Sequence, residues 1–564
     1  MDHHPDPLDL LTKRLDMLER RVCALEHPSE TPSATIVRAS ETAQDAEPLP
    51  TVLAGGAFSV LGKAMIGIAG AYLLRAVAES TSFPKPLIAT LAIAYVMLWL
   101  ICAARARTGF STITYASTSG LILAPMLWEL TLSFKVLTGV ESATVVSAFV
   151  GTASALAWKR NLTSIFWIAN ITAAMVAFGL SIASREMTPF IAALLLMALL
   201  SEYAAFLGHG QSVSALVAVF ADLAIGAQFY IYASPQSERT DYPLLGTVAL
   251  ILPPLTLFLI YGTSLTVKTI FLKREMSAFE ALQATLAFVL LAGSVLTCAP
   301  QRGSIVLGAI CLLLSAVSYA TVIGVFCRRP ERRNERIFGT WSAALLLAGS
   351  VLCLPTPSVA LCLAMAAMMA TLLGVQLNRP LLQFHGAAYL IAAAVASGQL
   401  FYAFKALVGT LPGAPAWSAY VVMVSAVSCY TAQKTCQEMT FEKKLLDFVS
   451  ALLVVSALAA LLVEGLVSLA ALRGTPAAHH IAFIRTLTIC VTFLALVFSG
   501  SHWQRIELTR IGYAALVLVA VKLIFEDLRL GHLEFTAASI FLFAITLIAV
   551  PRVRTPERHL KIQM

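Results

Sequence analysis

Long apolar segments follow one another along most of the chain, and short polar stretches separate them. A helix needs about 20 predominantly apolar residues to cross the hydrocarbon core of a bilayer. Cutting the chain at charged positions and at Pro- or Gly-rich breaks predicts eighteen membrane-spanning helices with short loops. Their expected ranges are 52–74, 87–104, 112–133, 137–157, 162–183, 188–208, 212–231, 243–267, 278–298, 303–326, 337–354, 357–376, 383–404, 417–433, 447–470, 481–500, 511–528 and 535–550. The pattern is typical of an all-α polytopic integral membrane protein.

The polar segments divide the chain into four regions. Residues 1–26 are predicted to form an amphipathic or coiled-coil helix, and residues 27–50 a disordered linker rich in Ser, Thr, Pro and Glu. Residues 51–551 form the expected multispan transmembrane domain, and residues 552–564 a basic cytoplasmic tail. The short loops leave no room for an inserted soluble domain, so any chemistry is expected within the membrane or at its rim.

Composition agrees with the membrane interpretation. Of all residues 59% are hydrophobic and 12% are charged, against about 25% charged residues in a soluble domain. The net charge of +8 does not indicate a nucleic-acid partner, because the basic residues lie mostly in short stretches between apolar segments. We expect the lipid bilayer as the main partner and no nucleic acid.

The distribution of Lys and Arg predicts the orientation of the chain. These residues favour cytoplasmic loops. With the amino terminus inside, the expected cytoplasmic loops carry about twice as many of them as the opposite loops. A missed or additional span would blur this contrast. The bias therefore favours an even number of spans with both termini in the cytoplasm.

Apolar residues near the amino terminus repeat at alternating spacings of three and four. This seam consists of Leu8, Leu11, Leu15, Leu18, Val22 and Leu25. Such a heptad pattern, with charged residues off the seam, is typical of coiled coils. One interpretation is a homo-oligomerisation helix, and the other is a single amphipathic helix on the membrane or on the cytoplasmic face of the protein.

The first span and its surroundings carry the most recognisable motif. In "LGKAMIGIAGAYLLRAVAESTSFP", the small residues Gly62, Gly67 and Gly70 precede a Leu-Leu pair, Arg75 and Glu79. This layout resembles the bacterial predicted membrane proteins catalogued as domain of unknown function 2339, although the chain lacks the Asn-Trp pair that often precedes their first span. The resemblance in layout covers most of the chain, and the similarity at the level of motifs covers about the first 100 residues. The resemblance implies a multi-pass protein of the bacterial inner membrane without an agreed activity.

Two of the carboxylates inside expected spans are the leading functional candidates. A charge at the centre of a transmembrane helix costs roughly 2.5–3.5 kcal/mol on insertion scales and usually faces the bundle interior. Asp222 in "LVAVFADLAIGAQF" is the deepest, and Glu202 in "LLSEYAAFLGHG" lies on the preceding span. Because consecutive spans are usually neighbours, the two could face one wet cavity and share a proton. The alternative is that each is hydrogen-bonded to a nearby Ser, Tyr or basic residue.

Basic side chains inside spans complete the candidate polar site. Lys63 and Arg485 are the deeper ones and could serve as countercharges, whereas Lys268 and Lys522 are expected to snorkel to an interface. A cytoplasmic cluster comprises Arg328, Arg329, Arg332, Arg333 and Arg336. This cluster is expected to set the topology or to contact anionic lipid headgroups.

No sequence motif of an enzyme accompanies these residues. The chain contains no nucleophile elbow, P-loop, dinucleotide fingerprint or HExxH, and no Cys pair at metal-ligand spacing. We therefore expect neither cofactor nor metal, and no catalytic residue. The sequence favours a transporter-like protein for small solutes or lipids. The alternatives are a membrane scaffold that recruits partners through its N-terminal helix, and an envelope glycan- or lipid-processing membrane enzyme, which the short external loops disfavour.

Overall fold

The computed structural model of the protein describes its membrane domain almost completely. The described residues are 49–79, 84–208, 211–235, 240–326, 332–409, 411, 413–433, 441–472, 474, 476–529 and 533–553. The chain separates into one unit up to Val60 and a second unit from Leu61 onwards, and the packing given below is that of the second unit. The heptad helix, nearly all of the linker, Arg328, Arg329 and the tail from residue 554 lie outside the described residues, so the predictions for them stay predictions.

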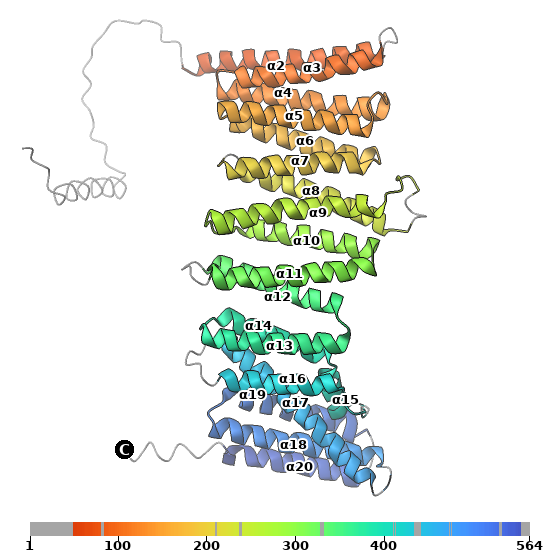
Figure 1. The fold of residues 1–564 in the computed structure, drawn as a ribbon, viewed down its shortest axis with the longest axis vertical. Coiled ribbons are helices and arrows are strands. Elements are labelled where there is room, and N and C mark those ends of the chain that lie inside the picture. Colours follow the sequence, from red (N-terminus) through yellow and green to blue (C-terminus); the bar gives the residue numbers. More distant parts are fainter. Residues whose placement is uncertain are drawn as a thin grey trace, which may run out of the picture. The chain divides into compact units, whose positions relative to one another are not determined.

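The described residues form helices and no strand (Figure 1). The first half contains α2 (Leu49–Glu79), α3 (Lys85–Arg105), α4 (Gly109–Trp128), η1 (Glu129–Ser133), α5 (Gly139–Arg160), α6 (Thr163–Ala183), α7 (Met187–Phe206), α8 (Gln211–Ala233), α9 (Thr247–Thr266), η3 (Val267–Phe271) and α10 (Ala278–Cys298). The second half contains α11 (Arg302–Gly324), α12 (Arg333–Cys353), α13 (Thr356–Gln376), α14 (Pro380–Ala396), α15 (Gln399–Val408), α16 (Trp417–Ala432), α17 (Phe441–Ala471), α18 (Ala478–His502), α19 (Ile506–Lys522), η6 (Leu523–Asp527) and α20 (Leu533–Val553). An all-helical protein is what a bilayer requires, because helices bond their backbone polar groups internally.

The helices confirm a multi-pass membrane protein. Among the described residues, 14 helices are long and apolar enough to cross a membrane, or 15 if the bent pair α14 and α15 counts as one span. Each of the eighteen expected ranges overlaps a helix, but α4, α16 and α20 are not among these spans. Helix α4 carries several Ser and Thr residues, and α16 has 16 residues. The count of eighteen and its even parity therefore stay predictions.

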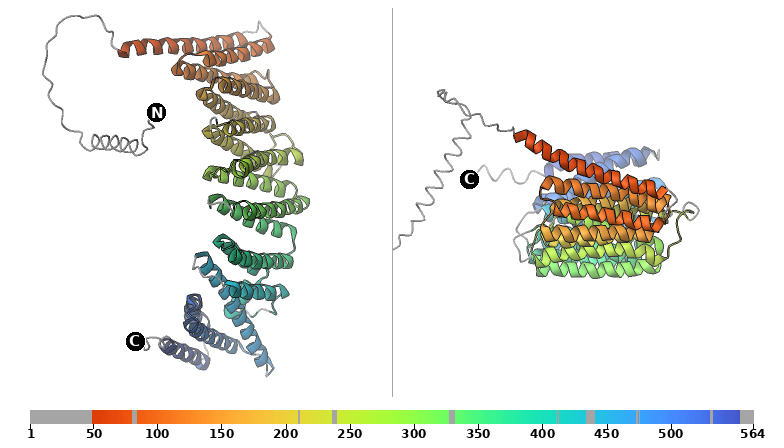
Figure 2. Two further views of the ribbon diagram at one scale, coloured as in Figure 1. Left: turned by 60° about the vertical axis from the view of Figure 1, so that its left-hand side comes forward. Right: turned by 90° about the horizontal axis from the view of Figure 1, so that it is seen from above.

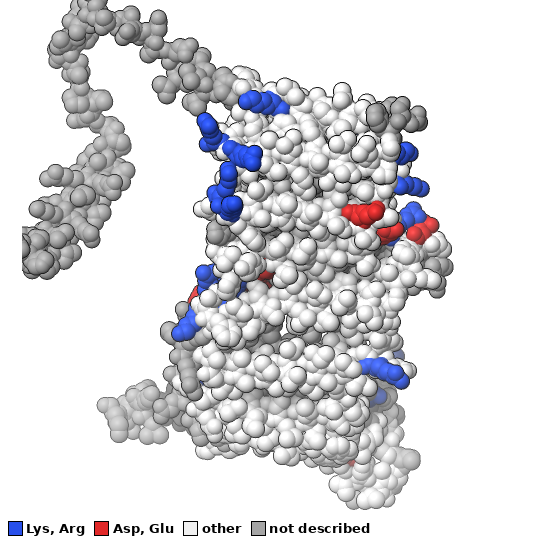
Figure 3. Space-filling view, turned by 45° about the horizontal axis from the view of Figure 1, so that its top comes forward, with Lys and Arg blue, Asp and Glu red and all other residues white. Residues whose placement is uncertain are grey.

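Helices that follow one another in sequence pack side by side, as short loops dictate (Figures 1 and 2). The main contacts join helices no more than three elements apart in the chain. One large apolar core lies among α3 to α10 and another among α12 to α17. On the face shown in Figure 3, charged side chains gather mainly along the two edges formed by helix ends, with an almost uncharged belt between them. This distribution fits a bilayer around the belt.

Small residues bring some helix backbones into direct contact. A Cβ atom added to Gly349 of α12 would lie 2.9 Å from the carbonyl oxygen of Gly308 on α11, and one added to Gly308 would lie 3.2 Å from that of Gly349. Lipid tails are as apolar as the helices, so such close packing is a main source of helix association in membranes. Gly308 and Gly349 therefore hold α11 and α12 together.

This contact predicts opposite effects for the same substitution at two helical glycines. Gly349→Ala places a methyl group against a backbone oxygen that cannot move aside, and we expect it to lower the free energy of unfolding by about 1–3 kcal/mol. Gly262→Ala on α9 is the control, because nothing lies within 4 Å of its added Cβ, and it should be neutral or slightly stabilising. Thermal melting of both purified variants checks this, and equal melting temperatures would contradict it.

Candidate functional site

A cavity of about 420 Å³ lies among α7, α8, α9 with η3, and α10. It is placed where α7 and η3 end and where α8 and α10 begin. Five charged residues line it, namely Glu202, Lys268, Arg274, Glu275 and Glu280. Its volume falls within the range of about 300–1,000 Å³ that is common for small-molecule sites. The cavity is therefore large enough for a small solute and polar enough to orient one.

Glu202 is the acidic centre of this cavity. Its side chain accepts hydrogen bonds from the hydroxyls of Ser214 on α8 and Ser264 on α9. The same carboxylate lies 2.9 Å from the Nζ atom of Lys268. The three partners come from α8, α9 and η3, so Glu202 of α7 joins the walls of the cavity.

Lys268 does not snorkel outward, and the expectation that it would is wrong. Its Nζ atom lies 2.9 Å from Glu202 and 3.0 Å from Glu280, and 15% of the side chain is exposed. Glu280 is held in turn by Ser277, whose backbone N–H donates to its carboxylate at 2.9 Å in a capping box at the start of α10. Two fixed carboxylates thus serve as the partners of the ammonium group.

Asp222 is buried in the middle of α8, one side chain away from the cavity. The amide Nε2 of Gln283, which lines the cavity, donates to Asp222 Oδ1 at 2.9 Å. Tyr261 also lines the cavity, and its buried hydroxyl has no hydrogen-bond partner among the described residues. No ion pair involves Asp222 in the described part of the chain. Glu202 therefore lines the cavity, whereas Asp222 lies behind the lining residue Gln283. That the two carboxylates share a proton stays a prediction.

The two expected countercharges lie elsewhere. Lys63 is exposed on α2, and Arg485 pairs at 2.7 Å with Glu526 rather than with Glu202 or Asp222. The cation that pairs with Glu202 is Lys268. One sequence signal could have indicated that Lys268 pairs with carboxylates. It is the Ser-x-x-Glu capping pattern at residues 277–280, which follows a lysine at the end of the preceding span.

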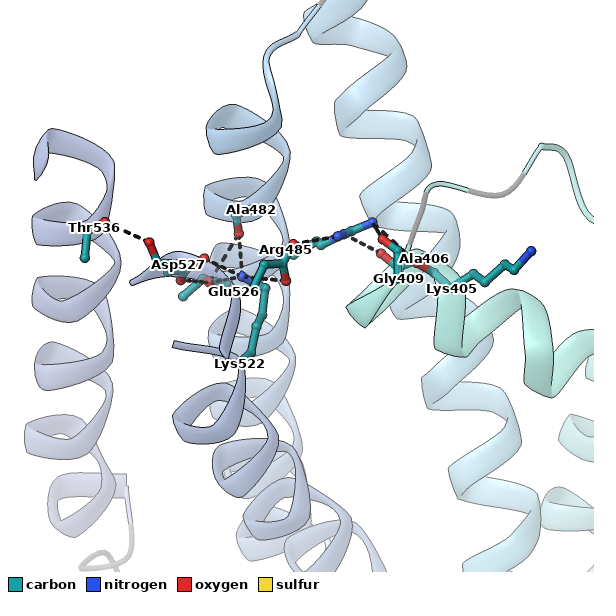
Figure 4. A network of polar contacts seen from close by, with 10 residues as sticks. Lys405, Ala406, Gly409, Ala482, Arg485, Lys522, Glu526, Asp527 and Thr536 are labelled. Atoms are coloured by element: carbon teal, nitrogen blue, oxygen red, sulfur yellow. Dashed lines mark hydrogen bonds and ion pairs between the residues drawn. The ribbon is translucent and has the colours of Figure 1, made fainter. Parts of the chain in front are cut away.

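Arg485 instead belongs to a second network, which joins α15, α18 and η6 (Figure 4). From α18 its guanidinium donates to the carbonyl oxygens of Ala406 at 2.9 Å, Lys405 at 3.4 Å and Gly409. These carbonyls lie at the end of α15, where helices leave carbonyl groups without intrahelical partners, although that of Lys405 also accepts the N–H of Gly409 at 3.0 Å. Helices α14 and α15 are bent by 65° at a break, so Arg485 fixes the end of this broken segment to α18.

Lys522 is the buried cation of the same network, and the expectation that it snorkels is also wrong. None of its side chain is exposed, and its Nζ atom lies 2.8 Å from Asp527 Oδ1. It also donates to the carbonyl of Ala482 and the hydroxyl of Thr486, each at 2.9 Å. With its three protons bonded, this ammonium group is fully satisfied and has a structural role.

Three π-helical turns place charged residues at these helix ends. In η1, η3 and η6 the N–H groups of Phe134, Leu272 and Leu528 bond to carbonyls five residues earlier, at 2.8 to 3.1 Å. Each wider turn presents a charged side chain to another element, namely Glu129 to Arg75, Lys268 to Glu202 and Glu526 to Arg485. Such turns are common at functional sites, and the apolar pattern of the sequence does not indicate them.

The remaining predicted residues are peripheral. Arg332, Arg333 and Arg336 are exposed at the start of α12, and their contact with lipid headgroups stays a prediction. Their neighbour Glu335 is buried and pairs with Arg379 at 2.9 Å. The described residues contain no group of three or more His, Cys, Asp or Glu side chains that could hold a metal ion.

No protein-family model, curated protein or solved structure matches the chain.

The pairing of Lys268 with two carboxylates predicts the order of stability of two variants. Lys268→Met leaves buried Glu202 without a cation and should cost about 3–5 kcal/mol. Glu202→Gln should cost less, because Lys268 keeps Glu280 as its partner. Thermal unfolding at pH 7 measures both. The control is Lys159→Met, which changes an exposed residue. A Lys268→Met variant as stable as this control would contradict the pairing.

The hydrogen bonds of Arg485 predict that lysine cannot replace it. A planar guanidinium donates in several directions at once, whereas an ammonium group is a point charge. We expect Arg485→Lys to lose about 2–4 kcal/mol of stability, because backbone carbonyls at the end of α15 lose their donors. The matched control is Arg185→Lys, whose arginine forms an exposed pair with Asp241 and should change stability by less than about 0.5 kcal/mol. Equal melting temperatures of Arg485→Lys and Arg185→Lys would contradict this prediction.

Proposed function

We propose that the protein is a membrane transporter, and that the cavity among α7, α8, α9 and α10 binds its substrate. The proposal rests on one observation, namely that a cavity and a buried carboxylate lie next to each other. A solute-sized cavity lies at one end of the helices, and Asp222 lies beyond its wall at mid-helix, bonded to the cavity through Gln283. Ionisable groups inside a membrane domain are costly, and they commonly mark solute or proton pathways.

The charges of the lining favour a small solute with a cationic group. Three carboxylates and two basic side chains line the cavity, so the acidic groups are in excess. Lys268 and its two carboxylates are already bonded to one another. A cationic solute can exchange with Lys268 as the partner of Glu202 or Glu280, which moves the lysine and changes the contacts among α7, η3 and α10. The substrate would in this way be coupled to the packing of the helices.

Asp222 is the residue that we propose carries the coupling proton. Its carboxyl is buried, it accepts a hydrogen bond from Gln283, and no cation is paired with it among the described residues. The titratable side chains of the neighbouring cavity are Glu202, Tyr261, Lys268, Arg274, Glu275 and Glu280. Binding or release of one proton at Asp222 changes the local charge without the movement of a side chain between helices.

The orientation and location of the protein follow from its sequence pattern and are part of the proposal. With both termini in the cytoplasm, the cavity opens at the cytoplasmic ends of α7 to α10. A bacterial inner-membrane location rests on the resemblance to domain of unknown function 2339, and homo-oligomerisation rests on the heptad seam. A scaffold or an envelope enzyme remains the alternative, but no catalytic constellation in the described part of the chain supports the enzyme.

Proton-coupled transport predicts that the Asp222→Asn variant loses solute-driven proton flux. Purified protein is placed in liposomes that contain a pH-sensitive dye, and amino acids, diamines and quaternary ammonium compounds are added in turn. We expect at least one of these cations to cause a change of internal pH with the wild-type protein and none with Asp222→Asn. Because asparagine can accept the same hydrogen bond from Gln283, the variant should still fold and bind the solute in a thermal-shift assay.

The control is Asp241→Asn, which neutralises an exposed carboxylate paired with Arg185 and should leave the proton flux unchanged. A flux in Asp222→Asn equal to that of the wild type would refute the role of Asp222. If no member of the panel binds to the folded wild-type protein, the cavity does not accept a cationic solute.

A further inference from the structure

A second cavity, of about 270 Å³, lies among α2, α3 and α4 with η1. It extends over the last turns of α2 and α4 and over the first turns of α3, so it is placed at one end of these three helices. Its walls are mainly aliphatic, and Ile68, Ala71, Ala92 and Ile122 are among the lining residues. An apolar cavity at the end of transmembrane helices faces the region where acyl chains meet headgroups.

The rim of this cavity carries three charges: Arg75 and Glu129 belong to its lining, and Glu79 lies just beyond the lining, paired with Arg75. Arg75 Nη1 lies 2.9 Å from Glu129 Oε1, and Arg75 Nε lies 3.2 Å from Glu79 Oε1. The exposed fractions of the three side chains are 48% for Arg75, 57% for Glu79 and 20% for Glu129, so each can still accept another partner. The rim therefore offers one cationic and two anionic groups within the reach of a single ligand.

One further polar group lies in the wall. Pro125 has no N–H to donate to the carbonyl of Leu121, which is four residues earlier in α4, and both residues line the cavity. The cavity therefore combines apolar walls with a rim that carries charges of both signs.

We propose that this cavity binds one zwitterionic phospholipid with an ammonium headgroup. One acyl chain packs against the aliphatic walls, the phosphate pairs with Arg75, and the ammonium group pairs with Glu129 and Glu79. The proposal selects a zwitterionic lipid over an anionic one, because the carboxylates outnumber the arginine and an anionic headgroup would have no group for them to bind. Basic pockets between transmembrane helices bind anionic headgroups, and the two carboxylates beside Arg75 favour a headgroup with an added ammonium group here.

Native mass spectrometry of the detergent-purified protein tests the proposal, with phosphatidylethanolamine and phosphatidylglycerol as the two probes. The wild-type protein should retain one molecule of phosphatidylethanolamine in preference to phosphatidylglycerol. Glu129→Gln removes one partner of the ammonium group while keeping the shape of the side chain. It should weaken the binding of phosphatidylethanolamine by about tenfold. The same variant frees Arg75 from one competitor and should reverse the preference between the two lipids.

A variant of the apolar wall provides an independent test. Ala71→Leu reduces the cavity without changing a charge, and it should lower the retention of both lipids. The control is Arg302→Gln, which removes an exposed charge at the start of α11 and should retain the wild-type lipid. Preference of the wild type for phosphatidylglycerol, or equal retention by the wild type, Glu129→Gln and Ala71→Leu, would overturn the proposal. Thermal melting of each variant confirms that the protein measured is folded. This site does not depend on the proposed transport function, so either can fail alone.

Discussion

The cost of an unpaired polar or charged group in hydrocarbon is the constraint on which this structure depends. Backbone groups avoid this cost by forming helices, because no water is present at mid-membrane. Charged side chains avoid it by pairing near helix ends, where several elements supply partners. Arg485 bonds to the carbonyls at the end of α15, and Lys268 lies between two carboxylates on neighbouring helices. The same rule explains both networks and the rim of the lipid cavity.

Asp222 is the exception to this rule, and this is why it is functionally informative. It lies at the middle of α8, where its bond to Gln283 does not neutralise a charge. The paired residues can be explained by stability alone, whereas an acidic residue at this depth without a cation reduces stability. This destabilising residue lies beside the polar cavity, which is the proposed binding site for a solute.

Rigid and adaptable regions are distributed unevenly among the helices. Close backbone packing, as at Gly308 and Gly349, leaves little freedom between α11 and α12. The contacts around Lys268 are instead polar bonds that a solute can exchange, and they join an η3 turn to the start of α10. A change in these pairs would alter the positions of neighbouring helices relative to one another. The proposed transport requires movement of this kind.

The sequence by itself determined the class of the protein, the approximate range of most described helices and the unusual position of Asp222, because hydrophobicity and length decide whether a segment spans a bilayer. It did not show the break that divides the expected span 383–404 into α14 and α15. It did not determine which cation meets which carboxylate. Most of these helices are apolar on all sides, so no amphipathic pattern states which face of each helix is turned inward. Lys268 and Lys522 were therefore expected at an interface, whereas tertiary packing placed each beside carboxylates on a following turn or a neighbouring helix. Only the fold could decide this, because the pairing depends on the rotation of each helix and on π-helical turns that local hydrophobicity does not encode.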